Sequence, residues 1–154
     1  MEDNQQLLDD ELLRSHADKP FGKVFTGKAI RNSVFFGGPL VAGYMMAKNF
    51  KTVGESHKMS TAWLGVIGYT IAFMVLNMTV LADINIPGIA FSVMNAFIAW
   101  QVFKSYQMPM VKNHVDQGGE TESIGHAVVA VILSVIATAL PIVIYFLAVD
   151  GSLF

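Results

Sequence analysis

Two long stretches without a formal charge stand at the centre of the sequence, on either side of a short polar break. The first runs from Met59 to Ala82 and has 24 residues, and the second runs from Ile84 to Phe103 and has 20. A helix that crosses the roughly 30 Å hydrocarbon core of a bilayer needs about 20 apolar residues, because each residue adds about 1.5 Å. Neither stretch alternates apolar and polar residues, as a strand of a membrane barrel does. The pattern therefore predicts a hairpin of two transmembrane helices that turns near Asp83.

The last apolar segment is also long enough to form a membrane span. Residues 123–149 carry no formal charge, and Glu120 and Glu122 stand just before them. Negative charges are favourable at this end of a helix because of the helix dipole. Pro141 inside the segment predicts a kink. We therefore expect a third long transmembrane helix after the hairpin.

The first apolar segment, residues 32–47, is too short to be interpreted in the same way. It has only 16 uncharged residues and contains Gly37, Gly38 and Pro39 in succession. A proline inside a helix removes one hydrogen bond and clashes with the preceding turn, so we expect the helix to be broken there. Two interpretations remain open. The segment is either a short kinked span or a re-entrant segment that returns to the side from which it entered.

The distribution of lysine and arginine bears on this choice, because the cytoplasmic flanks of membrane spans are enriched in both residues. Residues 1–31 hold five of them, residues 48–58 hold three and residues 104–123 hold two. If segment 32–47 crosses the membrane, five basic residues lie on each side. If it returns, all ten lie on one side, which fits the enrichment better.

The re-entrant interpretation predicts the side on which each polar segment lies. Lys28, His57 and His114 share one side of the membrane, together with the basic residues. Asp83 and Ser152 lie on the opposite side. A full crossing of the first segment predicts instead that Lys28 and His57 are separated by the membrane.

These segments together predict an all-α integral membrane protein. We expect a helical bundle of three long transmembrane helices and a short first helix broken at Gly37, Gly38 and Pro39. A soluble, acidic segment of residues 1–31 precedes the membrane domain, and residues 150–154 form a tail. The membrane domain covers residues 32–149, with apolar segments at residues 32–47, 60–82, 86–103 and 123–149.

The composition agrees with a membrane location and excludes several kinds of chemistry. Hydrophobic residues make up 53% of the chain and charged residues 14%, against about 25% charged residues in soluble proteins. The formal net charge of -2 gives no reason to expect a nucleic-acid partner, which usually requires a basic surface. The chain has no cysteine, so disulfides, thiolate metal sites and cysteine nucleophiles are excluded. The partner that the composition indicates is the lipid bilayer.

Small and weakly polar residues recur at helical spacing within the apolar segments, where they allow a second helix to approach closely. Gly43 begins one such pair in the first segment, and Gly65 and Gly68 share part of one face in the second. In the last segment the hydroxyls of Ser134 and Thr138 can also bond backbone carbonyls near the proline. The full set of candidate helix-packing residues is Gly37, Gly38, Pro39, Gly43, Gly65, Gly68, Asn77, Asn95, Ser134 and Thr138.

Two asparagines occupy matching positions in the predicted hairpin. Asn77 and Asn95 lie nine residues on either side of Ile86. In an antiparallel hairpin they sit at similar depth, so we expect their amides to hydrogen-bond across the two helices. Such bonds average about 0.6 kcal/mol in membranes and reach about 2 kcal/mol, which makes packing register the expected role. A polar path for a solute is the alternative role.

No pattern of catalytic or metal-binding residues accompanies these segments. The four histidines are isolated, and none has a second histidine three or four residues away, as a helical metal site requires. Ser56, Ser123 and Ser134 lack the Gly-x-Ser-x-Gly sequence of a nucleophile elbow. Asp83, in a short turn, is expected to be solvated. We therefore expect no enzyme activity, no cofactor and no metal.

A run of residues at the first apolar segment carries a resemblance to a known family. It reads Phe-Phe-Gly-Gly-Pro-Leu-Val-Ala-Gly-Tyr from Phe35 to Tyr44 and is followed by Asn49, Phe50 and Gly54. This run resembles a motif of small uncharacterised bacterial integral membrane proteins. A looser similarity continues through Gln101, His114, Gly118, Gly119 and Ser123. The resemblance implies a bacterial inner-membrane location, and it assigns no activity to any residue.

On these grounds the sequence predicts a non-catalytic membrane interaction or scaffold protein, whose helix faces bind a protein partner or a second copy of the chain. The alternative is an oligomeric channel or transporter subunit, because a broken helix at membrane depth is tolerated where it is buried in protein or lines a water-filled cavity. The sequence identifies no substrate.

Overall fold

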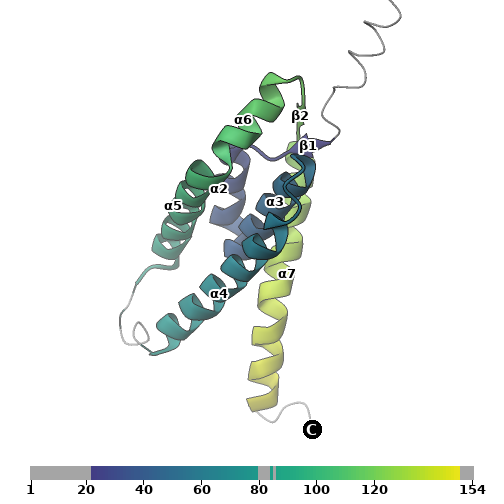
Figure 1. The fold of residues 1–154 in the computed structure, drawn as a ribbon. Helices are drawn as coiled ribbons and strands as arrows, with labels where there is room; N and C mark the ends of the chain where they lie inside the picture. The colour runs from purple at the N-terminus through teal and green to yellow at the C-terminus, as the bar shows by residue number, and fades with distance from the viewer. Residues whose placement is uncertain (1–21, 80–83, 85, 150–154) are drawn as a thin grey trace, which may run out of the picture.

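The computed structural model describes residues 22–79, 84 and 86–149, and this part of the chain is mostly helical (Figure 1). The predicted N-terminal segment up to residue 21, the tail, Asp83 and Ser152 lie outside the described residues. The prediction of a mostly helical chain is confirmed for the described residues, whereas the pair of short strands and the short helix at Met108–Asp116 were not predicted. The elements are β1 (Lys23–Val24), α2 (Gly27–Gly37), α3 (Pro39–Thr52), α4 (Lys58–Thr79), α5 (Gly88–Tyr106), α6 (Met108–Asp116), β2 (Glu120–Thr121) and α7 (Ile124–Val149).

The Gly-Gly-Pro sequence forms a turn between two helices. α2 ends at Gly37, Gly38 has a φ of 72°, and α3 begins at Pro39. A positive φ is strained for a residue with a side chain but is open to glycine. Proline suits the first position of a helix, because its missing N–H has no partner there in any case. The predicted break is therefore the boundary between two helices and not a kink within one.

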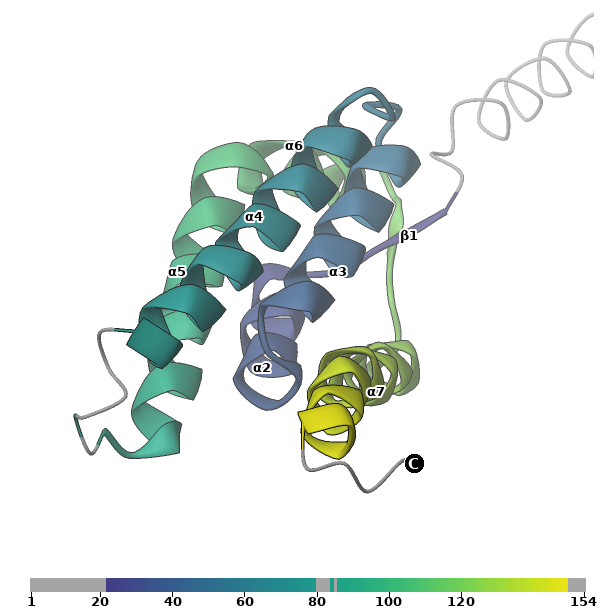
Figure 2. The same cartoon turned by 90° about the horizontal axis from the view of Figure 1, so that it is seen from below.

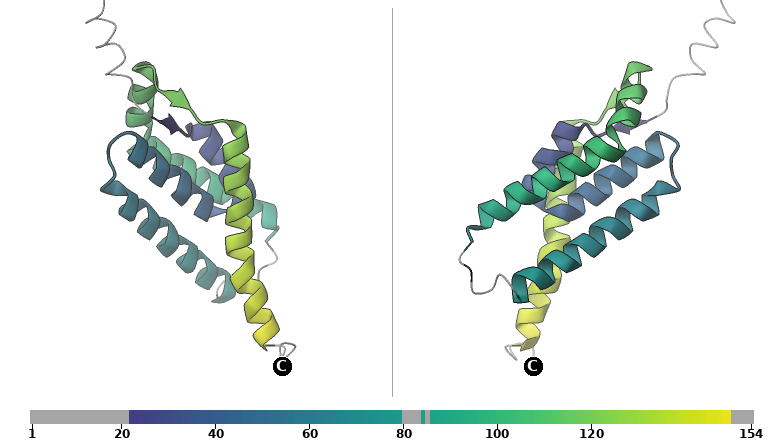
Figure 3. Two further views of the ribbon diagram at one scale, coloured as in Figure 1. Left: turned by 90° about the vertical axis from the view of Figure 1, so that its right-hand side faces the viewer. Right: turned by 60° about the vertical axis from the view of Figure 1, so that its left-hand side comes forward.

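The end of α3 lies beside the residue that precedes α2. Asn49, in the last turns of α3, accepts a hydrogen bond from the Phe25 N–H at 2.7 Å and donates one to the Phe25 carbonyl at 2.9 Å. The chain therefore goes out along α2 and comes back along α3 (Figure 3). The re-entrant position of this hairpin in a membrane stays a prediction. The 11 residues of α2 extend about 16 Å, roughly half the thickness of a bilayer core.

α3 lies at the centre of the fold, where α2, α4 and α7 pack against it (Figure 2). α5 packs mainly on α2. Helices α3 and α4 lie close together at Gly43, where a Cβ atom would lie 2.6 Å from Val66 Cγ1. The apolar core includes six side chains that are no more than 1% exposed, those of Val24, Phe25, Ile30, Val34, Val41 and Met45.

The two strands join distant parts of the chain at one end of the molecule. β1 and β2 run parallel, with Lys23 opposite Glu120 and Val24 opposite Thr121. A salt bridge of 2.7 Å between Lys23 Nζ and Glu120 Oε2 crosses the pair on its exposed surface. Figure 1 shows α6 at the same end, from which α4 and α7 extend away.

Two helices in the described part of the chain are long and apolar enough to cross a membrane, α4 at Lys58–Asn77 and α7 at Ile124–Pro141. The prediction of three long transmembrane helices is therefore wrong by this criterion. α5 has 19 residues, but polar Asn95, Gln101 and Lys104 lie within it. A stretch without charges is a weaker requirement than a stretch that is apolar throughout, and this difference explains the error.

Candidate functional site

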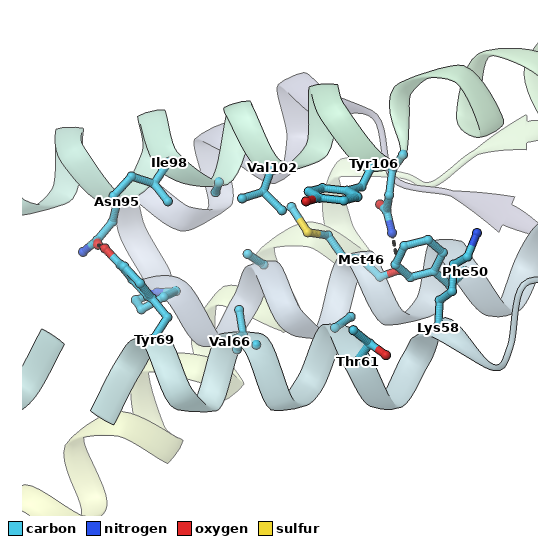
Figure 4. A pocket seen from close by; sticks show the side chains of 16 residues that line it. Met46, Phe50, Lys58, Thr61, Val66, Tyr69, Asn95, Ile98, Val102 and Tyr106 are labelled. Carbon is cyan, nitrogen blue, oxygen red and sulfur yellow. Dashed lines mark hydrogen bonds between the residues drawn. The ribbon is translucent and has the colours of Figure 1, made fainter. Parts of the chain in front are cut away.

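A cavity of about 490 Å³ lies between α4 and α5, with α3 as its floor (Figure 4). Within the described residues α4 rests on α3 and α5 rests on α2, so the two outer helices stay apart and leave a groove between them. The walls of the groove are mostly hydrocarbon. Side chains that line it include Met46 and Phe50 from α3, Thr61 and Val66 from α4, and Ile98 and Val102 from α5.

One hydrogen bond between α4 and α5 closes the end of the groove that lies away from Lys58, which we call the deep end. The Tyr69 hydroxyl of α4 donates to Asn95 Oδ1 of α5 across 2.5 Å, and Asn95 is 8% exposed. Asn77, the expected partner of Asn95, donates its Nδ2 to the Phe73 carbonyl of its own helix at 2.7 Å. The prediction of a bond between Asn77 and Asn95 is therefore wrong. The hairpin of α2 and α3 holds α4 and α5 apart, and the longer tyrosine side chain spans the gap.

The opposite end of the groove carries a positive charge and lies at the beginning of α4. Lys58 lines the cavity there, and its side chain is 44% exposed. Its Nζ is 3.1 Å from Glu55 Oε2, and an exposed ion pair of this kind contributes about 1 kcal/mol or less. Tyr106 and Gln107 line the same cavity from the end of α5. The groove is thus amphipathic along its length, with a cation at one end and hydrocarbon over most of the rest.

A buried pair of amides anchors the floor of the groove. Asn49 and Gln107 are each 1% exposed, and Asn49 Nδ2 donates to Gln107 Oε1 at 3.3 Å. Gln107 Nε2 in turn donates to the Met46 carbonyl at 2.7 Å, the bond drawn in Figure 4. With the two bonds between Asn49 and Phe25, these groups form an amide cluster that joins the start of α2, α3 and the junction of α5 with α6. Since the amides bond one another and the backbone, we interpret the cluster as structural.

A buried carboxylate joins α3 to the segment before α7. Glu122, whose side chain is 5% exposed, forms an ion pair with Lys48, and its Oε2 is 2.8 Å from His126 Nδ1. Burial by itself raises the pKa of Glu122, but the hydrogen bond and charge of Lys48, together with His126, hold that pKa below its ordinary value. Oε2 has no other hydrogen-bond partner among the described residues. It is therefore satisfied only when His126 Nδ1 carries a proton.

A second cavity, of about 290 Å³, lies between α3, α7 and the first turns of α4. Tyr44, Trp63 and His126 are among the residues that line it. It is smaller than the groove between α4 and α5. Both cavities lie beside α4, and none of the residues of α4 from Lys58 to Asn77 is buried.

The structure brings several of the predicted packing residues together at α7. Gly37 lies against this helix, where a Cβ atom would be 3.2 Å from Val131 Cα. The Gly37 carbonyl accepts a hydrogen bond from Ser134 Oγ at 2.8 Å, so the backbone at the break is bonded within the protein. Thr138 Oγ1 donates to the Ser134 carbonyl of its own helix at 2.8 Å, as its position near the proline suggests.

Gly65 and Gly68 have no contact of this kind within the described part of the chain. No described atom lies within 4 Å of the position that a Cβ atom would take at either residue. Gly65 lines the groove between α4 and α5, whereas Gly68 does not. The expectation that this face touches another helix stays a prediction about a partner.

The sequence did not predict the hydrogen bonds of Asn49, Gln107 and Tyr69, or the burial of Glu122. Asn49 and Gln107 are 58 residues apart, and Glu122 is 74 residues from Lys48, so no local spacing connects them. The available signal was weak. Asn49, Gln107 and Glu122 adjoin apolar segments, where a side chain is usually solvated at the membrane surface, and Tyr69 lies within one.

Comparisons of the chain with protein-family models, with curated proteins and with solved structures gave no match. The resemblance to small bacterial membrane proteins therefore stays a prediction. The geometry of the described residues is the basis for the proposals that follow.

Proposed function

We propose that the chain is a small integral membrane protein without catalytic activity, in which longer helices enclose a re-entrant hairpin and bind a partner within the bilayer. The observation that carries this proposal is the exposed apolar surface of α4, where none of the residues from Lys58 to Asn77 is buried. A water-soluble monomer rarely exposes an apolar patch larger than a few hundred Å². In a bilayer the same side chains face lipid.

The position of the polar groups supports a membrane location. The strand pair, the salt bridge between Lys23 and Glu120 and the carboxylate of Glu122 gather near one end of the molecule, and α4 and α7 extend from it (Figure 1). At the far end of the hairpin, Ser134 bonds the Gly37 carbonyl. A backbone group inside hydrocarbon requires such a partner, because no water is present to bond it.

The same contact favours a binding role over a conducting one. A pathway through the broken hairpin would use backbone carbonyls freed at the break to contact a solute. The Gly37 carbonyl is instead engaged by Ser134, and Gly37 itself packs against Val131. We propose that the exposed faces of α4 and α7 bind a protein partner or a second copy, in a bacterial inner membrane.

The topology tests this proposal directly, because the chain has no cysteine that would interfere with labelling. Single cysteines at Lys28, His57 and the exposed Asn113, next to the buried His114, are expected to react with a membrane-impermeant reagent on one side of the membrane. Single cysteines at Asp83 and Ser152 are expected to react only on the other side. Labelling of His57 together with Asp83, on the side away from Lys28, would overturn the re-entrant arrangement.

Two further experiments test separately whether the chain spans a membrane and whether it conducts a solute. The chain should stay with the membrane fraction after extraction at alkaline pH, and its release into the soluble fraction would contradict a membrane-spanning protein. The purified protein in liposomes should show no solute flux. A reproducible flux through the purified protein would make the oligomeric channel or transporter the better interpretation.

A further inference from the structure

We propose that the groove between α4 and α5 binds one acyl chain of an anionic phospholipid, with the lipid headgroup at Lys58. This inference rests on the membrane location proposed above. It adds a ligand of defined chemistry and places each part of that ligand against described residues.

The length of the groove favours a hydrocarbon chain over a helix as its occupant. From Lys58 to Tyr69, α4 advances by 11 residues, or about 16 Å. The hydrogen bond between Tyr69 and Asn95 joins the two walls at that point and ends the groove. A membrane-spanning helix of a partner or a second copy is about 30 Å long and would extend past this bond. An extended hydrocarbon chain can instead lie within the cavity of about 490 Å³ and end at the bond.

The walls suit the tail of a lipid. They consist mostly of carbon, with Met46, Val66 and Val102 along the middle of the groove (Figure 4). The polar groups at the deep end, the Tyr69 hydroxyl and the Asn95 amide oxygen, bond each other at 2.5 Å. A terminal methyl group that reaches this end therefore meets polar atoms that already have a partner, and it leaves no buried hydrogen bond broken.

Apolar walls alone do not explain selective binding in a bilayer, because lipid tails are as apolar as leucine and gain little by exchanging one such surface for another. Selectivity therefore has to come from the headgroup. Lys58 stands at the polar end of the groove with three N–H donors, and its pairing with Glu55 leaves the side chain 44% exposed. A lysine near the surface attracts an anionic lipid by about 1 kcal/mol, which corresponds to a preference of about five-fold over a neutral headgroup.

Binding of phosphatidylglycerol and phosphatidylcholine with identical chains tests the inference. Native mass spectrometry of the purified protein in mild detergent measures both affinities and also the number of copies of the chain. The wild type is expected to bind one phosphatidylglycerol per chain, about five-fold more tightly than phosphatidylcholine. Equal affinity for the two lipids would overturn the assignment of Lys58 to the headgroup.

Two glycines of α4 form a matched pair of variants for the tail. Gly65→Phe places a ring in the groove, and the open space there allows it without a clash in the described chain. Gly68→Phe places the same ring on the same helix in equally open space, but outside the groove. We expect Gly65→Phe to weaken binding of both lipids at least ten-fold and Gly68→Phe to leave it unchanged. Equal binding by the two variants would exclude the groove as the site.

Two lysines provide the matched pair for the headgroup. Lys58→Gln is expected to abolish the preference for phosphatidylglycerol while phosphatidylcholine still binds. Lys51→Gln, which removes an exposed charge at the end of α3 that does not line the cavity, is expected to keep the preference. Loss of the preference in both variants would show that the whole basic surface attracts the lipid and that Lys58 has no special role.

The oligomeric state in the same spectra identifies the competing occupant. If Gly65→Phe converts a dimer into a monomer and Gly68→Phe does not, the groove is an interface between two copies and the lipid assignment is wrong. Failure of the lipid tests in a protein with the expected topology would overturn this inference alone. Release of the chain from membranes at alkaline pH would overturn the proposed function as well.

Discussion

Replacing Asn49 with alanine tests whether the amide cluster fixes the returning hairpin. The alanine can no longer accept a hydrogen bond from the Phe25 N–H or donate one to the Phe25 carbonyl. It also loses the bond that Asn49 Nδ2 donates to Gln107 Oε1. Phe25 is 1% exposed, so water does not replace the missing amide. Two backbone groups that hold the start of α2 against the end of α3 are then left without these partners.

The size of the effect follows from the number of groups that lose a partner. A buried polar group left unsatisfied costs about 1–3 kcal/mol, so the two groups of Phe25 together cost about 2–6 kcal/mol. Gln107 adds less, because its Nε2 keeps the bond to the Met46 carbonyl. We expect Asn49→Ala to lower the free energy of unfolding by about 4 kcal/mol. This is a large part of the roughly 5–15 kcal/mol that stabilises a typical folded protein.

Unfolding of the purified protein by sodium dodecyl sulfate in mild detergent, followed by circular dichroism, measures this loss. Asn113→Ala is the matched control, because Asn113 is an exposed amide whose Oδ1 accepts one weak bond of 3.4 Å from Gln117. An exposed substitution of this kind changes stability by about 0.5 kcal/mol or less. If Asn49→Ala lies within about 1 kcal/mol of the Asn113→Ala control, the amide cluster does not hold the hairpin and the reasoning fails.

Two further predictions concern the contacts of α3 with its neighbours. The pKa of Glu122 in the folded chain lies below its ordinary value of 4.5, so its ion pair with Lys48 stabilises the fold above that pH, and the stabilisation is lost as the pH falls through the folded pKa. Stability measured from neutral pH down to about 3 should therefore fall less steeply in Glu122→Gln than in the wild type, and identical slopes would contradict this. Gly43→Val should lower the free energy of unfolding by about 1–3 kcal/mol, because its Cβ meets Val66 at 2.6 Å. Gly65→Val has open space and should not be destabilising, so equal losses for the two valine variants would contradict the packing of α3 on α4.

Local signals were sufficient to predict the long apolar helices and the break between α2 and α3, but not the short helix α6. Gly38 and Pro39 act through their own backbone geometry, which does not depend on the rest of the fold. The long uncharged runs likewise predict α4 and α7, because helix length and apolar content are properties of one segment. The distribution of lysine and arginine favoured a segment that returns to the same side of a membrane. The structure shows that α2 and α3 form a hairpin, and the side on which each end lies stays a prediction.

Contacts between distant segments were beyond the reach of the sequence. The symmetric positions of Asn77 and Asn95 suggested a bond only on the assumption that α4 and α5 pack closely along their length. The structure packs α4 on α3 and α5 on α2 instead, and the two helices meet through long side chains such as Tyr69. Tyr69 is aromatic in an apolar helix, and nothing in its sequence surroundings distinguishes it from a lipid-facing residue. The amide cluster depends on three segments meeting, and a polar residue in any one of them resembles an exposed one.

The separation of these contacts along the chain has a consequence for how the protein is made. Phe25 and Asn49 are 24 residues apart, whereas Gln107 follows Asn49 by 58 residues and Glu122 follows Lys48 by 74. Chains begin to fold from the N-terminus while synthesis continues. The ribosome therefore releases α2 and α3 long before Gln107 and Glu122. For that interval the hairpin has only its internal contacts, which include the bonds between Asn49 and Phe25 and the bond from Thr52 Oγ1 to the Lys23 carbonyl. The last third of the polypeptide then completes the set of contacts around α3.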